Sequence, residues 1–400
     1  MVAVLTRIFG PQHLELAEDV VQDTLLKALH HWKFHGVPKD PTAWLFAAAR
    51  NKALDVLRRV RHQRDYEAEL SPLLKSEYSA GATLQQLLSP EAIEDEQLRM
   101  MFICCHPSLP QESQVALILK TLCGFSLAEI AHAFLANEDA ISKRLFRARQ
   151  QFREEAIPFV LPSADALPDR LHNVHTVIYL IFNEGYHASH HPSAIRDDLV
   201  EEALRLAKML TDHVFSCTND SLALVALLCF QAARLYSRVD PNGHLLTLKE
   251  QNRALWNVEL IRQGTHYLQQ ASQGPVLSVF HLEAAIAYEH ASAPSYEATA
   301  WPRILQLYDW LYQLQPNGVV LMNRAIALAE VAGPESALHE LEALKQDEAL
   351  TNYALLPATR GDLCARLGRQ EEAKIFFERA LALTQSPAEK VLLARRIAAC

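Results

Sequence analysis

The feature that most constrains this chain is a helical spacing of apolar residues that runs through almost its whole length. Apolar residues recur three and four positions apart, Ala and Leu dominate, and alternating runs of β-branched residues are scarce. This spacing buries one face of an α-helix, whereas a half-buried strand needs strict alternation. The sequence therefore predicts an all-α fold.

The length and composition narrow the class of protein. The chain has 400 residues, enough for two to four domains at roughly 100–200 residues each. Half of the residues are hydrophobic, and 12 Gly and 19 Pro are too few for a collagen-like or disordered chain. There is no uncharged apolar run of about 18 residues and no start typical of a signal peptide. We therefore expect no membrane span and a cytoplasmic location.

Two breaks in the helical pattern predict the domain boundaries. Residues 71–89 are rich in Ser, Gly and Leu, which is typical of a linker, and Pro158, Pro162 and Pro168 cluster before the longest helical stretch. The sequence thus predicts four parts: a helical domain over 1–65, a linker over 66–100, a second helical domain over 101–157 and a large helical extension over 158–400.

The extension carries a faint repeat. Gly333 and Gly368 lie 35 residues apart, and each is followed by a similar helical pattern that includes Ala337 or Ala373. Tetratricopeptide helix pairs repeat at about 34 residues, with small residues where two helices pack closely. We therefore interpret the extension as a tetratricopeptide-like solenoid; two unrelated helical hairpins would be the alternative.

The charges are segregated along the chain. The formal net charge of −9 argues against a uniformly basic surface, but cations concentrate within residues 50–64 and 143–153, and the stretch from 91 to 96 between them is acidic. Two basic helices separated by a linker suggest two contacts with one polyanion.

The first basic helix has a clear start signal. Asp40 can cap it, and Pro41 suits its first position. Its apolar stripe is formed by Leu45, Ala49, Ala53, Val56 and Val60. The preceding loop, residues 30–39, holds Trp32, Phe34 and several cations. Cations bind phosphates and aromatic faces stack unpaired bases, so this segment suits melted DNA. The alternative is an ordinary amphipathic helix with a solvated basic face.

The second basic helix is predicted to belong to a helix-turn-helix. Ser126 can cap a short helix over 127–134, and Asn137 can cap the next helix after a brief turn. A buried stripe in that helix is expected from Ile141, Leu145, Ala148 and Phe152. The second helix of such a motif enters the DNA major groove, although a plain helical hairpin would show the same pattern.

A third motif lies near the start of the chain. Glu18 and Gln22 share a helix face, as do Asp19 and Asp23, because each pair is four residues apart. This row of carboxylates and an amide suggests a docking face for a basic or amide-rich partner. A solvated acidic face is the alternative.

These three motifs together resemble the extracytoplasmic-function sigma factors of bacterial RNA polymerase. Residues 18–24 are similar to the family's core-polymerase-binding helix, residues 44–59 to its helix for the −10 promoter element, and residues 125–149 to its helix-turn-helix for the −35 element. The resemblance implies core-polymerase contacts by Glu18, Asp19, Gln22 and Asp23. It implies −10 contacts by Trp44, Arg50, Asn51, Lys52, Arg58 and Arg59. It implies −35 contacts by Ser142, Lys143, Arg144 and Arg147.

The rest of the chain looks like one subgroup of these sigma factors. Residues 102–107, 167–171 and 179–186 are similar to sigma factors with a large C-terminal tetratricopeptide-like extension. The resemblance implies a bacterial initiation factor that is not an enzyme, needs no cofactor or metal, and binds core RNA polymerase and promoter DNA. It also implies that the extension takes part in regulation, with an unknown peptide, protein or small molecule as its signal.

Two features depart from the family pattern. The chain starts at Met1, where the family has more of its first helix, so either the start is misassigned or a short first helix weakens core binding. The turn over residues 135–138 lacks the more usual Gly and Pro. The base specificity of the family therefore does not carry over to this chain.

Two rival interpretations remain open on the sequence. The first is a helix-turn-helix transcriptional regulator with a sensory solenoid, which would bind DNA without polymerase. The second is a metal-dependent hydrolase built on residues 183–191, which hold one Glu, one Tyr and three His, but an HExxH motif is absent. The adjacent Cys104, Cys105 and His106 make a poor zinc site, and we interpret the seven cysteines as free and mostly buried thiols.

Overall fold

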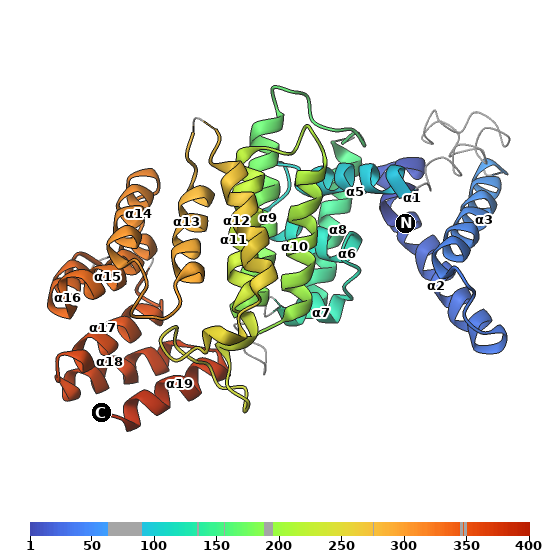
Figure 1. The fold of residues 1–400 in the computed structure, drawn as a ribbon. Helices are drawn as coiled ribbons and strands as arrows, with labels where there is room; N and C mark the ends of the chain where they lie inside the picture. Colours follow the sequence, from blue (N-terminus) through green and yellow to red (C-terminus); the bar gives the residue numbers. More distant parts are fainter. Residues whose placement is uncertain are drawn as a thin grey trace. The chain divides into compact units, whose positions relative to one another are not determined.

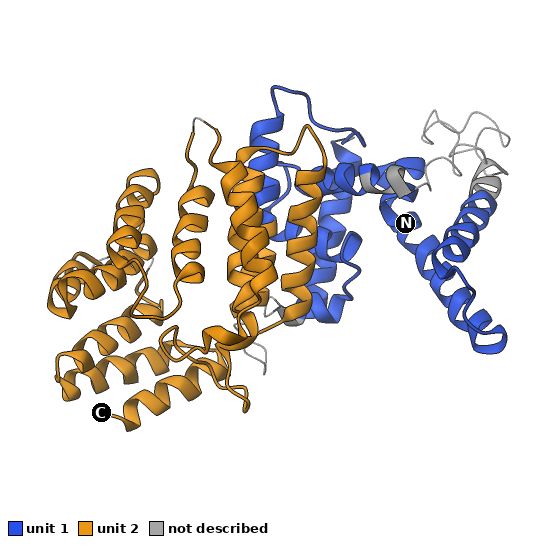
Figure 2. Ribbon diagram, in the orientation of Figure 1, with its two compact units in different colours: residues 1–177 blue, residues 178–400 orange. Residues whose placement is uncertain are grey.

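The chain folds into two compact helical units. The computed structural model describes residues 1–62, 90–133, 136–155, 157–187, 195–274, 276–344, 347 and 350–400, with the backbone alone described at 57–62, 90–94 and 132–133. The units comprise residues 1–177 and 178–400 (Figure 2). All regular elements among the described residues are helical, which confirms the predicted all-α class.

The first unit begins with three helices and a short 3-10 turn. These are α1 (Val2–Phe9), η1 (Pro11–His13), α2 (Leu14–His35) and α3 (Pro41–His62). Helix α1 is nearly all apolar, and Val4, Ile8 and Phe9 are fully buried against Val20 of α2 and Ala53 of α3. Helices α2 and α3 lie side by side as a hairpin (Figure 1). The short first helix is therefore the centre of a small hydrophobic core.

The second part of this unit contains the predicted helix-turn-helix. Its helices are α5 (Pro90–Cys104), α6 (Gln111–Thr121), α7 (Leu127–Ala133) and α8 (Glu138–Glu154). The Ser126 hydroxyl accepts from the Glu129 amide at 3.2 Å, and the Glu129 carboxylate accepts from the Ser126 amide at 2.7 Å, a reciprocal capping box. The Asn137 side chain accepts from the Ala140 amide at 2.7 Å and caps α8. The start signals expected of Ser126 and Asn137 are confirmed.

Helix α5 occupies part of the segment expected to be a linker. It begins at Pro90 and packs against α1 and α6. Glu96, expected in an acidic linker patch, is buried on this helix and ion-paired with Arg7 and Arg99. Burial raises the pKa of Glu96, although the two guanidinium groups oppose this shift. The acidic run is thus partly a structural contact of the first unit.

The second unit is a succession of helices joined by short connections. Helix α9 (Leu167–His187) contributes its last turns. The remaining elements are α10 (Asp197–Asp212), α11 (Asn219–Ala233), η3 (Leu235–Arg238), η4 (Arg253–Leu255), α12 (Val258–Ala271), α13 (Val279–Ser292), α14 (Trp301–Leu314), α15 (Gly318–Ala332), α16 (Pro334–Leu341), η5 (Glu342–Leu344), α17 (Leu355–Arg366), α18 (Gln370–Leu383) and α19 (Pro387–Ala398).

Consecutive helices of this unit pack on their chain neighbours from α10 to α19, as in a helical-repeat solenoid. Helix α11 is buried on nearly all sides because it contacts α10, α12 and α13. Gly333 and Gly368 have φ angles of 86° and 75°, which a glycine adopts readily at a helix end. A Cβ on Gly361 of α17 would lie 2.7 Å from the Phe377 ring of α18, so a larger residue would separate these helices.

Candidate nucleic-acid interface

The exposed side of α2 carries most of the acidic motif. Helix α2 buries Leu14, Ala17, Val20, Thr24 and Ala28. Asp19, Gln22 and Asp23 lie away from this stripe and are exposed. These three predicted docking residues are therefore accessible to a partner.

Glu18 is different, because it is engaged inside the first unit. Its carboxylate accepts from Arg149 of α8 at 2.5 Å, and the same guanidinium lies 3.1 Å from the Glu15 carboxylate. The Glu18 and Arg149 side chains are only 12% and 16% exposed. Burial raises the pKa of Glu18, whereas Arg149 and Lys120 oppose this shift. Glu18 is thus covered by the helix-turn-helix rather than presented to a partner.

Two leucines on the same side of α2 escaped the sequence reasoning. Leu26 and Leu29 are 56% and 67% exposed, and their spacing places them in a row with Asp19 and Gln22, opposite the buried stripe. An exposed apolar row beside polar groups is typical of a protein-docking surface. The helical periodicity of the sequence could have indicated this exposure, since both leucines lie outside the apolar stripe. We call Asp19, Gln22, Leu26 and Leu29 the docking ridge.

Helix α3 begins as predicted and presents part of its basic side. The Asp40 carboxylate accepts from the Ala43 amide at 2.9 Å. Asn51 is exposed and Arg50 is half-buried. Lys52 reaches the Asp23 carboxylate of α2 at 2.6 Å, so the structure pairs two residues that were predicted to bind different partners. The side chains of Arg58 and Arg59 lie outside the described residues.

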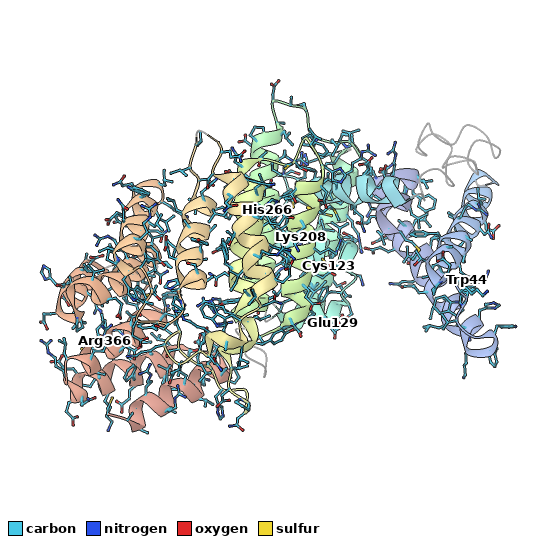
Figure 3. The ribbon with its side chains drawn as sticks, in the orientation of Figure 1. Trp44, Cys123, Glu129, Lys208, His266 and Arg366 are labelled. Carbon is cyan, nitrogen blue, oxygen red and sulfur yellow. The ribbon has the colours of Figure 1, made fainter. Side chains whose placement is uncertain are left out.

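An aromatic cluster stands where α2 and α3 meet, and Figure 3 shows Trp44 at this place. The Trp44 ring stacks on His31 with centroids 5.4 Å apart and meets the edge of Trp32 at 5.6 Å. Trp44 is therefore half-buried among aromatic neighbours. Phe34 projects into solvent and is 75% exposed. The cluster could stack unpaired bases chiefly through Phe34 and the open edges of the other rings.

The segment from His30 to His35 corrects one expectation. It was predicted to be a loop before the basic helix, but it forms the last turns of α2. The loop proper covers only residues 36–40, with Gly36 at φ 76° ending α2. The aromatic residues are consequently held on a helix, which fixes their spacing.

Helix α8 exposes the residues expected to contact the −35 element. Its buried stripe is Ile141, Leu145, Ala148 and Phe152, as predicted. Ser142, Lys143 and Arg147 are exposed on the other side. Arg144 lies 2.6 Å from the Glu112 carboxylate of α6, so this predicted DNA contact is partly neutralised within the unit.

Phe146 is a further exposed residue of α8 that the sequence reasoning did not single out. It is 54% exposed, and its spacing from Ser142 and Lys143 places it on the same side of the helix. An apolar side chain in the major groove can contact the methyl group of thymine. The exposure of this phenylalanine could have been predicted from the sequence, because it lies outside the buried stripe of α8.

The groups considered for metal binding are placed differently from a metal site. Within the described ranges, no three His, Cys, Asp or Glu residues come together in a metal-binding arrangement. Burial raises the pKa of Cys104 to about 12, and its thiol lies 3.6 Å from the Thr121 hydroxyl. The Nδ1 of His187 lies 3.5 Å from the Arg238 guanidinium. Residues 188–191 lie outside the part of the chain that the structure describes.

Four of the seven cysteines, Cys104, Cys105, Cys229 and Cys364, are buried, and all seven are free thiols. The predicted free thiols are confirmed. Among the helices that the structure describes, none combines the length and apolar character that a bilayer crossing requires.

Three family models match the chain. Sigma-70 region 2 matches residues 1–63, Sigma-70 region 4 matches residues 99–152, and a family of unknown function matches residues 170–272. The first two matches coincide with the α1–α3 core and with the helix-turn-helix, in the order that the motifs predicted.

The chain is also similar to curated relatives, one along nearly its whole length and others over about a third of it. An uncharacterized protein of Rhizobium meliloti is 37% identical over 94% of this chain and 88% of its own length. The extracytoplasmic-function RNA polymerase sigma-E factors of Escherichia coli and Salmonella typhimurium are each 28% identical over 36% of this chain and 74% of their own length. No solved structure matches the chain.

Proposed function

This chain belongs to the extracytoplasmic-function sigma factors, with a C-terminal helical extension, and on that premise we propose that it directs core RNA polymerase to specific promoters. The observation that carries the proposal is the pair of sigma-70 matches, region 2 followed by region 4. Each match lies on a described helical domain that exposes candidate contact residues. The protein then acts in the cytoplasm, where polymerase and promoter DNA are found. It contributes binding and performs no covalent step.

We propose the docking ridge as the contact for core polymerase. Asp19 and Gln22 supply acceptors and donors, and Leu26 supplies apolar area. An interface of this kind gains most of its free energy from a few buried apolar or aromatic anchors, with polar groups setting orientation. Glu18 and Asp23, engaged by Arg149 and Lys52, join the contact only if those ion pairs open.

For the −35 element, α8 enters the major groove. Lys143 and Arg147 contact phosphates or guanine, and Ser142 and Phe146 lie beside them on the exposed side. Phosphate contacts set position, whereas base-edge contacts set sequence preference.

For the −10 element, α3 and the end of α2 capture bases that have left the duplex. Unstacking a base costs a few kcal/mol. Stacking on Phe34 or Trp44 at about 1–3 kcal/mol per base, with phosphate contacts from Arg50, offsets this cost. Asn51 is exposed beside them and can bond a base edge.

The test is run-off transcription with bacterial core polymerase and fragmented genomic DNA of the source organism, with and without the full chain. We expect discrete transcripts that share an upstream sequence. Asp19→Asn with Gln22→Ala should remove both the transcripts and retention of the chain by core polymerase. Glu371→Gln, on the exposed start of α18, is the matched control and should change neither.

A chain that binds DNA fragments but never core polymerase would overturn the proposal in favour of a helix-turn-helix regulator. Stoichiometric zinc with hydrolytic activity would favour the hydrolase. Both are measured on the same preparation as the transcripts.

We also propose that the extension controls the activity of the sigma domains within one chain. The support is the covalent linkage of a solenoid-like unit to both sigma-70 matches. Removing residues 160–400 should change the rate of promoter-dependent transcription, once circular dichroism shows that the remaining helices are folded. An unchanged rate would refute the control.

A further inference from the structure

The second unit contains a cavity of about 660 Å³. Its walls come from α9, α11, α13, α14 and α15, and four aromatic side chains line it: Tyr179, Phe230, Trp256 and Tyr308. Small-molecule sites usually measure about 300–1,000 Å³ and combine apolar walls with a few convergent polar groups. The size and aromatic lining therefore fit an organic molecule.

One wall carries a cation without an ionic partner. The Arg234 guanidinium donates to the neutral Gln231 amide oxygen at 2.9 and 3.3 Å, and it forms no ion pair within the described part of the chain. A second cavity of about 630 Å³ shares His290 and Tyr308 with the first.

Two arginines of the second cavity are neutralised, whereas its Lys249 lies over the Tyr296 ring at 5.9 Å. Arg366 lies 2.7 Å from Glu330, and Arg396 lies 3.4 Å from Asp362. Figure 3 shows Arg366 on α17. The first cavity thus holds a guanidinium that no carboxylate neutralises within the described residues.

Two further polar atoms of the lining lack partners within the described residues. The indole Nε1 of Trp256 and the Nδ1 of His290 are buried and find no hydrogen-bond partner among the described residues. Arg253 holds both groups in place, because it stacks over Trp256 at 4.6 Å and donates to the His290 carbonyl at 2.5 Å. The indole can only donate, so an acceptor from a ligand would satisfy it.

The lining also offers a carboxyl group. Glu283 is hydrogen-bonded to the Tyr179 hydroxyl, and its Oε2 is buried without a partner among the residues described. Tyr308 lines the same cavity. The cavity therefore offers a guanidinium and an indole N–H to an anion, and a carboxyl oxygen to a hydrogen-bond donor.

We propose that this cavity binds a small organic acid, whose carboxylate meets Arg234 and Trp256 and whose hydroxyl or amino group faces Glu283. The body of the molecule packs among the aromatic rings. A charged group bound to a guanidinium forms the stronger kind of hydrogen bond, so the carboxylate supplies most of the selectivity. Arg234 and Trp256 both lie within the region matched by the family of unknown function.

The test is ligand-observed saturation-transfer NMR with the full chain and a panel of aromatic and aliphatic carboxylic acids, 3-phenylpropionate among them, each paired with its primary amide. We expect at least one acid to bind about 10-fold more tightly than its amide. Binding is measured without polymerase or promoter DNA, so its failure is distinguishable from a failure of the sigma function.

The variants make the test specific to this cavity. Arg234→Gln should abolish the preference for the acid, Arg234→Lys should retain part of it, and Trp256→Phe should weaken acid binding while keeping an aromatic wall. Arg262→Gln removes an exposed arginine of α12 and should leave binding unchanged. Because the Lys and Phe variants are conservative, they keep the test decisive if Arg234→Gln does not fold.

A panel in which no acid is preferred over its amide, or a preference that survives Arg234→Gln, would overturn the proposal. The source of the carboxylate is resolved by short peptides that end in phenylalanine, as free acid and as amide. Binding by these peptides without binding by any free organic acid would also overturn it, since the site would then hold a chain terminus.

Discussion

Glu283 is a carboxyl group whose charge depends on its surroundings near neutral pH. Burial raises its pKa from 4.5 to about 7, and the hydrogen bond from Tyr179 opposes the shift. Between these two values the folded state holds more of the proton than the unfolded state does. The free energy of unfolding must therefore fall as pH rises through this window, and level off above it.

Replacing Glu283 by Gln should remove this dependence. Between pH 5 and pH 8 we expect the wild-type chain to lose on the order of 2 kcal/mol more stability than Glu283→Gln. Urea unfolding at both pH values measures the difference, with Glu371→Gln as an exposed control. Equal pH dependence in wild type and Glu283→Gln would contradict the assignment.

Phe146 offers a second residue-level prediction. Phe146→Ala should weaken binding of promoter DNA by the polymerase complex about 3- to 10-fold, because an apolar contact in the groove is lost. Its stability should change little, since the side chain is more than half exposed. Competition binding with promoter fragments measures the effect. Ile375→Ala, an exposed apolar truncation on α18, is the control; if it weakens binding equally, Phe146 has no special role.

The residue scale also shows where sequence reasoning succeeds. The caps at Asp40, Ser126 and Asn137 were predictable because a cap depends on residues three positions away. The partners of Glu18 and Glu96 were not, because Arg149 and Arg7 are distant in sequence. Contacts between residues close in sequence can be predicted from the sequence pattern. An ion pair between distant residues becomes apparent only in the folded structure.

At the scale of elements, the contact between α8 and α2 bears on function. Arg149 joins α8, the helix proposed to read the −35 element, to α2, which carries the docking ridge. The −10 and −35 elements lie about 25 base pairs apart, or roughly 85 Å of B-DNA at 3.4 Å per base pair. If α3 and α8 contact these elements as proposed, simultaneous contact with both requires that α8 move away from α2.

Breaking this contact should promote activity. Arg149→Ala removes the ion pairs, and we expect more transcript at limiting core polymerase, because less free energy is needed to separate the helices. The pair itself leaves Glu18 Oε1 and Arg149 Nε without partners among the described residues, so its net contribution to stability is small.

Arg153→Ala is the control for loss of positive charge, since Arg153 is an exposed cation near the end of the same helix. Transcript levels that fall with Arg149→Ala, or rise equally with Arg153→Ala, would contradict a resting state in which Arg149 holds α8 against α2.

Element boundaries were predictable where the sequence has strong helix start and stop signals. The helix-turn-helix followed from its caps and stripe, whereas α5 was merged into the linker because its acidic start lacks a clear apolar stripe. The end of α2 was mistaken for a loop, since its cations and aromatic residues do not follow the buried stripe. A solvent-facing helix end shows no periodic spacing of apolar residues.

For the whole molecule, two compact units predict two unfolding events. Trp32 and Trp44 lie in the first unit, while Trp256, Trp301 and Trp310 lie in the second. In the double variant Trp32→Phe, Trp44→Phe, fluorescence reports the second unit alone, whereas far-ultraviolet circular dichroism reports all helices. We expect the two urea transitions to differ in midpoint. Coincident transitions would show that the units unfold as one.

The all-α class and the order of the parts could be predicted, because helical spacing and three motifs extend over the chain. The cavity in the extension could not, since Tyr179, Glu283 and Tyr308 come from separate helices and Arg234 caps the end of α11. Only their packing brings them to one space.

The boundary between the units falls inside α9, which begins at Leu167 and ends at His187. Helix α9 therefore contributes residues 167–177 to the first unit and residues 178–187 to the second. Anyone grafting this extension onto another sigma factor should place the junction before Leu167. A splice at the compact-unit boundary would interrupt the helical hydrogen bonds of α9 in mid-turn and leave out Val174 and Val177, which are fully buried.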